Sequence, residues 1–477
     1  MAAGSQGVGE QWSSRTAFLL AAVGAAVGLG NIWRFPTLAG ESGGGAFVLI
    51  YVLCVALIGL PLLLAETLIG RAGGHNADSV GSIAEVAELS GRSKSWSIFG
   101  GIGLVTIFLI LSFYSVVAGW VLYYVWLSAA DFLGSLMAGN PLAGAFTGMS
   151  QDQVTGMMGE LFANPFQLIL QHAIFMGLTL AIVAVGVTGG IERAAKWMMP
   201  GFFGLLILIT IYSAFTGDFG AAMSFLFTPD FSKLSPAVIN DALGQACFSL
   251  SVGGAILITY GSYVPRHVRL GPTAVMIAAV DTGVAIMAGL MIFPIVFSAG
   301  LDPAGGPGLI FQTLPVAFQQ MPAGALVGFA FFILIFFAAL SSSIALLEAP
   351  VAFVIRRFRI GRRLAASLVA LAAFLIGVAC ALGYNVLSDV RPLWFWPTFA
   401  DADILDSIDD ITGKIGLPLA GLGVAIFTGW RASRRLVEAE LDMSRGMFLI
   451  WHALVAWLAP VMVFLILLFG LVPSLLA

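Results

Sequence analysis

Two short strings of glycine and serine interrupt segments that are otherwise apolar. Residues 24–31 read GAAVGLGN, and residues 249–254 read SLSVGG. A glycine in a helix interior costs about 1 kcal/mol relative to alanine, so both strings predict a break in a helix. Freed backbone carbonyls bind cations, and the N-terminus of a half-helix binds an anion. The two strings therefore predict a buried site for a cation and a charged ligand.

Close packing of helices through small residues is the other interpretation of each string. It leaves unexplained why polar residues accompany both strings, namely Asn31, Ser249 and Ser251. A dinucleotide-binding loop fits less well, because no strand precedes the glycines. Ligand binding is the interpretation that covers both strings.

Four ionisable residues lie inside apolar segments, where a charge is costly and usually functional. They are Arg34, Glu66, Asp281 and Glu348. Each could instead be a structural partner for exposed backbone. For Glu66 we favour that structural role, because a carboxylate beside an unwound segment can accept N–H groups that the helix no longer uses.

Three consecutive hydroxyls, Ser341, Ser342 and Ser343, occupy another apolar segment. Such hydroxyls commonly bond to carbonyls of their own helix. Alternatively, Ser341 and Ser342 turn toward the first string and offer oxygens to a hard monovalent cation. His172 and His452 are isolated on apolar segments, and we interpret them as packed or interfacial residues.

The elements that position these residues are membrane helices. Of the 477 residues, 60% are hydrophobic and 10% are charged, whereas a soluble protein has about 25% charged residues. Crossing ~30 Å of hydrocarbon takes about 20 apolar residues. In lipid the backbone must satisfy its own hydrogen bonds, and the sequence lacks the alternating apolar and polar residues of a β-barrel, so the spans are predicted to be helices. We predict an all-α integral membrane protein with eleven spans, at 16–38, 46–70, 97–127, 166–188, 193–215, 238–261, 272–298, 324–355, 363–384, 402–430 and 446–473.

The basic residues predict the orientation. With a cytoplasmic N-terminus, every Lys and Arg falls on the inner side except Arg34, Lys233, Arg391 and Lys414, and segment 128–165 contains neither. This asymmetry follows the positive-inside rule, and the odd number of spans places the C-terminus outside, in the periplasm or extracellular space. We expect a bacterial inner-membrane protein whose first span is retained, because no basic region precedes a short apolar core.

Several partner classes are disfavoured by composition. The net charge of −4 is spread without blocks, which argues against nucleic acid. Cys54, Cys247 and Cys380 lie in apolar segments without ligand spacing, so we expect buried small hydrophobes rather than disulfides or a metal site. In the outer loops, residues 150–153 (SQDQ) predict a capping box, and the aromatic run at 394–396 suits an interfacial belt.

Longer strings resemble the neurotransmitter:sodium symporter family, specifically its bacterial amino-acid transporter branch of eleven spans. They are WSSR at 12–15, AVGLGNIWRFP at 26–36, ESGGGAF at 41–47, Glu66 with Gly70 and Arg71, and ITYGSY at 258–263. The similarity covers essentially the whole chain. It implies two inverted five-helix repeats, at 16–215 and 216–430, with unwound first and sixth helices. An N-terminal cytoplasmic segment (1–15) precedes them, and a cytoplasmic loop with an eleventh helix (431–477) follows.

The resemblance also implies two sodium sites. In the first, the ligands would be the Ala26 carbonyl, Asn31, Ser249 and the substrate carboxylate, with Asp281 near the position of a ligating asparagine of the family. The second would use the carbonyls of Gly24, Val27 and Ala338 with the hydroxyls of Ser341 and Ser342. Ligands that are all oxygen suit a hard cation such as sodium.

The substrate carboxylate would lie beside Gly28, Gly30 and the Tyr114 hydroxyl. Monoamine carriers of the family have an aspartate at the position of Gly28, so this glycine favours an amino acid. The side chain would point toward Ile110, Val117, Phe248, Gly254, Ser342 and Leu346, and Ala25, Ala26, Ser249 and Ser251 complete the expected binding residues. Gly254 replaces a bulkier residue of leucine-type members, which leaves room for a large or aromatic side chain.

The same resemblance implies an outer gate of Arg34 and Asp409, with Phe248 as a lid over the substrate. Tyr51, Glu66, Gln245 and Glu348 would support the binding residues from behind. The inner gate pair of the family is replaced here by Gly9 and Arg356, so we expect that lock to be missing; Arg15 and the basic loop are candidates for its replacement. Chloride-dependent relatives bind the anion near Tyr51, Gln245 and Ser249, and we expect Asp281 to supply that charge instead, so that chloride is not required.

The resulting hypothesis is a sodium-coupled symporter that imports an amino acid, hydrophobic or aromatic, by alternating access, as a monomer or weak homodimer. A proton-coupled carrier of the same fold and a receptor or channel that binds without transport remain alternatives, and proton countertransport through Asp281 stays open. An enzyme is disfavoured, because no nucleophile–base pair or metal cluster lies within the spans.

Overall fold

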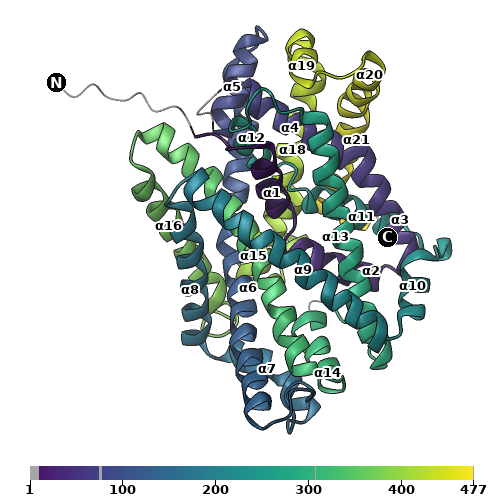
Figure 1. The fold of residues 1–477 in the computed structure, drawn as a ribbon. Coiled ribbons are helices and arrows are strands. Elements are labelled where there is room, and N and C mark those ends of the chain that lie inside the picture. Colours follow the sequence, from purple (N-terminus) through teal and green to yellow (C-terminus); the bar gives the residue numbers. More distant parts are fainter. Residues whose placement is uncertain (1–9, 75–77, 307, 476–477) are drawn as a thin grey trace.

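The computed structural model describes residues 10–74, 78–306 and 308–475, and within them every regular element is helical (Figure 1). Nine continuous helical stretches in these ranges are long and apolar enough to cross a membrane. They are Gly45–Ala72 (with α3 and α4), Lys94–Met137 (with α6, Ile98–Met137), Pro165–Val183 (α8), Val187–Thr216 (with α9, Arg193–Thr216), Leu270–Ser298 (α13), Gly324–Phe358 (α15), Arg362–Leu382 (α16), Ile404–Arg431 (with α17 and α18) and Arg445–Leu471 (with α20 and α21). These stretches correspond to nine of the eleven predicted spans.

The first predicted span is broken, as its glycines indicate. Helix α1 (Arg15–Ala26) is followed by non-helical backbone at Val27 and then by a π-helical turn (Gly30–Arg34) that continues into α2 (Phe35–Glu41). The two parts are bent by 50° relative to each other. Ser14 begins α1, and its hydroxyl accepts a hydrogen bond from the backbone N–H of Ala17.

The sixth predicted span is broken in the same way. Helix α11 (Pro236–Ser249) and helix α12 (Ile256–Ser262) are separated by non-helical residues 250–255. Ser251, Gly253 and Ala255 have φ angles of 54°, 82° and 59°. Residues other than glycine rarely adopt such positive φ angles. Both breaks therefore lie where glycine and serine predicted them.

The third span is longer than predicted. Helix α6 comprises Ile98–Met137, whereas the apolar run predicted an end near residue 127. The ten added residues contain good helix formers, and the chain turns only at Gly139 and Asn140. The Asp131 carboxylate holds the returning loop by accepting a hydrogen bond of 2.8 Å from the Phe146 N–H. The loss of apolar character thus marked the membrane boundary and not the end of the helix.

Short helices cover the two ends of the bundle. Helices α5 (Ser79–Leu89) and α19 (Arg434–Leu441) lie at one end, and α7 (Gln151–Ala163) and α14 (Leu314–Gln319) at the opposite end (Figure 1). We call these ends the α5 face and the α7 face. The predicted capping box is present, since Ser150 and Gln153 exchange hydrogen bonds of 2.8 and 3.3 Å at the start of α7.

The core brings both breaks together. Helix α15 packs along α6, and α1 lies against α9, α13 and α15. Helix α12 packs on α4 (Leu60–Ala72), where a Cβ on Gly70 would lie 2.0 Å from the Ile258 carbonyl oxygen. Close approach at Gly70 thus seats the second half of the broken sixth span. The two interruptions then face a common interior bounded by α6 and α15.

Candidate functional site

A small cavity of about 50 Å³ lies between the two breaks. Twelve of the thirteen residues predicted to surround the substrate line it: Ala25, Ala26, Gly28, Gly30, Ile110, Tyr114, Phe248, Ser249, Ser251, Gly254, Ser342 and Leu346. Four more apolar residues line it that sequence reasoning did not include: Leu29, Ile107, Ile256 and Leu417. Val117, which was also expected to face the side chain, is buried but does not line the cavity.

Gly28 leaves room for two hydroxyl groups that lie close to its backbone. A Cβ there would lie 2.4 Å from the Ser342 hydroxyl and 3.1 Å from that of Tyr114. The Tyr114 hydroxyl accepts a long hydrogen bond of 3.4 Å from the Leu29 N–H. This end of the cavity therefore presents hydroxyls and exposed backbone within a buried setting, an arrangement suited to a small charged group.

At the other end of the cavity, beside Gly254, there is less free space than the sequence indicated. A Cβ on Gly254 would lie 2.9 Å from Ile107 Cγ2 and 3.1 Å from the Ser251 carbonyl oxygen. Part of the space expected from this glycine is thus occupied by Ile107. In this conformation, a large side chain can enter only if Phe248, Leu417 or Ile107 moves.

A buried polar cluster joins the first break to α13. The Asn31 amide nitrogen donates to Asp281 Oδ1 at 2.7 Å and to Ser249 Oγ at 3.0 Å. Ser249 in turn donates to Asp281 Oδ2 at 2.7 Å. Asn31 and Asp281 are fully buried. The Asp281 carboxylate thus contacts two of the predicted ligands of the first sodium site, Asn31 and Ser249.

This cluster fits a hard monovalent cation by its chemistry. It offers one carboxylate and one hydroxyl; the Asn31 amide oxygen accepts a hydrogen bond of 3.1 Å from the Gly28 N–H and would face a cation here only after the amide turns over. A buried carboxylate without a cation close by is unfavourable, because burial penalises its charged form. A sodium ion there would be neutralised by Asp281 and held by the oxygens of Asn31 and Ser249.

A second group of oxygens surrounds the Ser342 hydroxyl. It lies 3.3 Å from the carbonyl oxygens of Gly24 and Val27 and 3.4 Å from that of Ala25. One hydroxyl proton cannot satisfy three carbonyls, so acceptors are in excess at this point. All five predicted ligands of the second sodium site are found in two groups. Ser342 lies beside the Gly24 and Val27 carbonyls, and Ser341 donates to the Ala338 carbonyl at 3.0 Å on α15.

Three of the four residues predicted to support the site, Glu66, Gln245 and Tyr51, lie behind it, whereas Glu348 pairs with Arg362 at the α5 face. Glu66 accepts a hydrogen bond of 2.6 Å from the Gly253 N–H, as its proposed structural role requires. Gln245 donates to the Gly30 carbonyl at 2.8 Å. The Tyr51 phenol faces Asp281 and Ser249. Both breaks are thus held by side chains from neighbouring helices.

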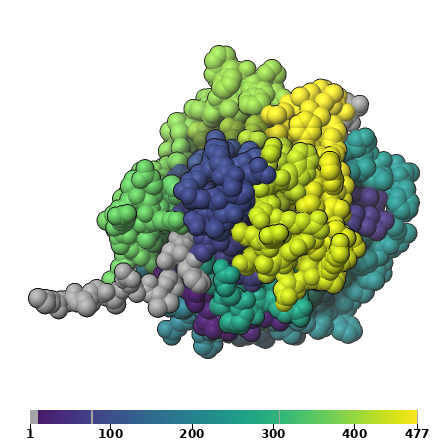
Figure 2. Space-filling model, turned by 90° about the horizontal axis from the view of Figure 1, so that it is seen from above, coloured from purple at the N-terminus to yellow at the C-terminus, as the bar shows by residue number. Residues whose placement is uncertain are grey.

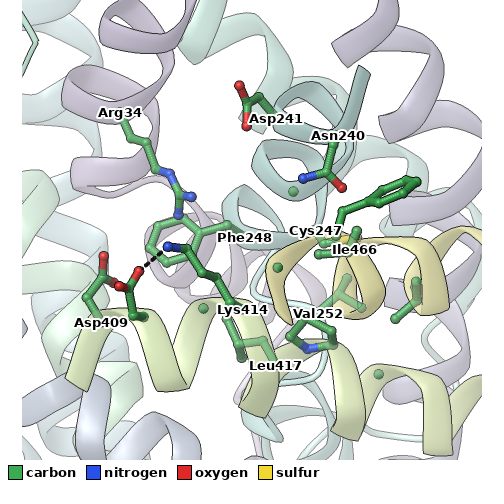
Figure 3. A pocket seen from close by; sticks show the side chains of 18 of the residues that line it. Arg34, Asn240, Asp241, Cys247, Phe248, Val252, Asp409, Lys414, Leu417 and Ile466 are labelled. Atoms are coloured by element: carbon green, nitrogen blue, oxygen red, sulfur yellow. Dashed lines mark ion pairs between the residues drawn. The ribbon is translucent and has the colours of Figure 1, made fainter. Parts of the chain in front are cut away.

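Phe248 separates the central cavity from a wider vestibule of about 260 Å³, which Figure 3 shows. The vestibule contains both predicted outer-gate residues, Arg34 and Asp409. The Arg34 guanidinium lies over the Phe248 ring, 4.6 Å from its centre. Within the described part of the chain, Arg34 and Asp409 form no ion pair; the carboxylate that is paired in this region is Asp410, at 2.5 Å from Lys414.

At the α5 face, Arg362 closes the other end of the molecule. It lies 2.8 Å from Glu10 of the N-terminal segment and also pairs with the fully buried Glu348 of α15. Glu348 accepts a further hydrogen bond of 2.9 Å from the Tyr263 hydroxyl, which follows α12. Sequence reasoning named the basic loop but not this arginine. The sequence does contain a signal for Arg362: it stands at the start of an apolar helix, and the preceding span contains an acid, Glu348.

The other inner-gate candidates have different partners. Arg356 lies 3.6 Å from Asp78, and Gly9 falls outside the described residues. Arg15 donates to the Thr273 hydroxyl at 3.2 Å and does not join the pair. The expected loss of the family's own lock is therefore accompanied by a different ion pair at the same face, with Arg362 at its centre.

The remaining candidates are packed. His172 is buried, with its Nε2 2.9 Å from the Ser115 hydroxyl. Among the residues that the structure describes, no three His, Cys, Asp or Glu side chains form a metal cluster. The aromatic run is exposed at Trp394 and Phe395, in keeping with an interfacial belt.

The fold and the site together define a membrane carrier: two broken helices enclose a buried site that a lid separates from one face and an ion-pair network from the other. Comparisons with known proteins agree. The family described as the Sodium:neurotransmitter symporter family, SNF, matches residues 9–138 and 152–388. The uncharacterized sodium-dependent transporter YhdH of Bacillus subtilis is 36% identical over 96% of both chains. An uncharacterized sodium-dependent transporter of Haemophilus influenzae is 34% identical over 96% of this chain and 97% of its own.

A solved structure shows the same similarity. The crystal structure of MhsT in complex with L-phenylalanine has a TM-score of 0.85 and 42% sequence identity, and the match covers 97% of this chain and 99% of MhsT. The chain belongs to the sodium:neurotransmitter symporter family. It is a sodium-dependent membrane transporter with the inverted-repeat fold of that family, and it is not an enzyme.

Proposed function

We propose that this protein imports an amino acid by coupling its entry to sodium. The observation that carries the proposal is the buried Asp281 carboxylate, bonded to Asn31 and Ser249 directly beside the cavity. A cation held there would lie next to the substrate's carboxylate. Each ligand would then stabilise the other, which is the energetic requirement for coupling.

Two sodium sites are proposed, the second around Ser342. Each sodium ion that enters at −100 mV gains about 2.3 kcal/mol from the membrane potential. Two ions supply roughly 4.6 kcal/mol, more than a thousandfold accumulation before the sodium gradient is counted. We propose that chloride is not required, since Asp281 already supplies a negative charge next to Tyr51 and Ser249.

The substrate is proposed to be hydrophobic or aromatic. Apart from Ser251 and Ser342, the side-chain end of the cavity is lined by apolar groups such as Ile107, Ile110 and Leu346. The structure of the similar protein MhsT contains L-phenylalanine. Because the cavity measures only about 50 Å³, binding of such a ligand requires the Phe248 lid to move.

The proposed setting is the bacterial inner membrane, with the α5 face in the cytoplasm and the C-terminus outside. The distribution of basic residues supports this orientation. The proposed repeats comprise residues 16–215 and 216–430, and we propose a monomer or weak homodimer. Substrate would then enter through the vestibule beside Arg34 and leave after the Arg362 pairs separate.

The test is uptake by purified protein in liposomes, with each of the twenty amino acids and with external sodium or choline. We expect sodium-dependent uptake of one or a few apolar amino acids, unchanged when gluconate replaces chloride. Asp281→Asn should lower uptake at least a hundredfold. Asp218→Asn is the matched control, since it removes a carboxylate from the cap of α10 (Phe219–Phe227) while asparagine still caps.

Three outcomes would contradict the proposal. Uptake in choline driven by a pH gradient would identify a proton-coupled carrier instead. Tight binding without uptake would indicate a receptor. Displacement of label by glycine or alanine alone would contradict the proposed substrate class.

A further inference from the structure

An apolar groove lies on the outside of the bundle, away from the central cavity. It has a volume of about 570 Å³ and runs between α6, α15 and α16. All of its lining side chains are apolar, among them Leu104, Phe108, Phe353, Leu364 and Leu368. Bulk lipid can cover a smooth helical surface, so contact with bulk lipid requires no hollow. A hollow of this size between three helices therefore favours an elongated apolar ligand.

A basic pocket adjoins the groove at the α5 face. Its volume is about 450 Å³, and Arg356, Arg357 and Arg359 line it together with Asp78. Phe353 lines both hollows, so the two meet at this side chain. Figure 2 views this face and shows the surface of the chain near residues 350–360 beside that of α5.

The charges in this pocket are unbalanced. Asp78 is paired with Arg356 at 3.6 Å. Arg357 and Arg359 are exposed, and no residue of the described ranges forms an ion pair with either. The helix ends between them, because Arg359 adopts a left-handed conformation with φ of 55° at the end of α15.

We propose that the groove and the basic pocket together bind one anionic glycerophospholipid. An acyl chain would occupy the groove, and the phosphate would lie between Arg357 and Arg359. Basic pockets between membrane helices on the cytoplasmic side bind acidic headgroups, and each basic residue near anionic lipid contributes about tenfold or less in affinity. A soluble phosphate ester would use only the arginines, whereas a zwitterionic lipid would use mainly the groove. The combination selects an anionic lipid.

The test is native mass spectrometry of the full-length protein with dioleoyl phosphatidylglycerol or dioleoyl phosphatidylcholine added in excess of detergent-bound lipid. We expect one phosphatidylglycerol to be retained preferentially. The double variant Arg357→Gln/Arg359→Gln should weaken its binding about 30-fold. The matched control is Arg269→Gln/Arg435→Gln, which removes two exposed arginines from other loops of the predicted inner side and should change binding less than threefold.

A second variant tests the groove without changing charge. Ala372 lines the groove and is exposed on the outer surface of α16, so Ala372→Trp should fill the groove without disturbing the core. We expect it to reduce phosphatidylglycerol retention at least tenfold. Four outcomes would each overturn the proposal. Two concern binding by the wild type: equal retention of both lipids, or competition by free glycerol phosphate that is as effective as competition by lipid. The other two concern the variants: equal loss of binding in the two double variants, or full retention of phosphatidylglycerol by Ala372→Trp.

Discussion

The two ends of the central cavity are closed by different kinds of contact. Toward the α5 face, the Trp12 indole donates to the Tyr260 carbonyl at 3.1 Å, and the Ser13 N–H donates to Glu192 at the same distance. Arg362 adds two ion pairs, one of them to a fully buried acid. Toward the vestibule, the lid consists of the Phe248 ring with Arg34 stacked on it.

This difference indicates which barrier is in place. The α5 face is closed by directional bonds that join the N-terminal segment to α15 and α16, which are far from it in sequence. The vestibule is hollow, and its two gate charges are not paired in this structure. The molecule is therefore closed on the side of the Arg362 pairs, and only a side-chain lid separates the cavity from the other side. Ligand can reach the cavity from the vestibule without breaking an ion pair.

The largest expected effect comes from removing Arg362. Arg362→Gln leaves Glu348 buried without its cation, and the loss of one partner of a buried pair costs about 3–5 kcal/mol. We expect the α5 face to open and sodium-dependent uptake to fall at least tenfold. Maleimide labelling of a cysteine at position 262, buried in the present conformation, measures the opening in a background that lacks the three native cysteines.

The neighbouring Arg363 provides the control. It is exposed, and no described residue forms an ion pair with it. Arg363→Gln removes the same charge and should leave labelling and uptake within twofold of the wild type. Equal labelling of the two variants would show that Arg362 does not hold this face closed.

A smaller effect is expected from Tyr263. Its hydroxyl donates to Glu348 at 2.9 Å, and a hydrogen bond to a charged group contributes about 1.5–3 kcal/mol. Tyr263→Phe should therefore open the α5 face less than Arg362→Gln, because the ion pairs remain. Labelling at position 262 should rise several-fold, while the Tyr123→Phe control on half-buried α6 surface leaves it unchanged. If labelling rose as much as in Arg362→Gln, the Tyr263–Glu348 hydrogen bond rather than the ion pairs would be what holds the α5 face closed.

Local signals were sufficient to predict the breaks and their supports. The cost of glycine within a helix marked both interruptions, and the polar residues beside them indicated binding rather than packing alone. The prediction that Asp281 lies beside the first break required only that its helix, α13, face that break. The family resemblance supplied the cavity residues, because the string around Gly28 is specific.

Contacts between distant helix ends could not be predicted in this way. Glu10 and Arg362 are 352 positions apart, and their meeting depends on how α1 and α16 pack at the same face. The room beside Gly254 was overestimated because the position of Ile107 depends on the rotation of α6. Hydropathy also placed the end of α6 too early, since a helix can continue beyond the membrane. Each of these properties is set by tertiary packing, which a single sequence does not specify.

The smallest expected effect concerns the vestibule. Because Arg34 and Asp409 are not paired here, Arg34→Gln removes a stacking contact of about 0.5–1 kcal/mol and a longer-range attraction to Asp241 and Asp409, and Asp409→Asn removes no ion pair. A double-mutant cycle on thermal stability should give a coupling energy below about 0.5 kcal/mol without ligand. With sodium and substrate, closure of the vestibule would bring the two charges together, so the coupling should grow. A large coupling without ligand would mean that both ends are closed by ion pairs at rest, and a coupling unchanged by ligand would mean that these two residues are not the gate.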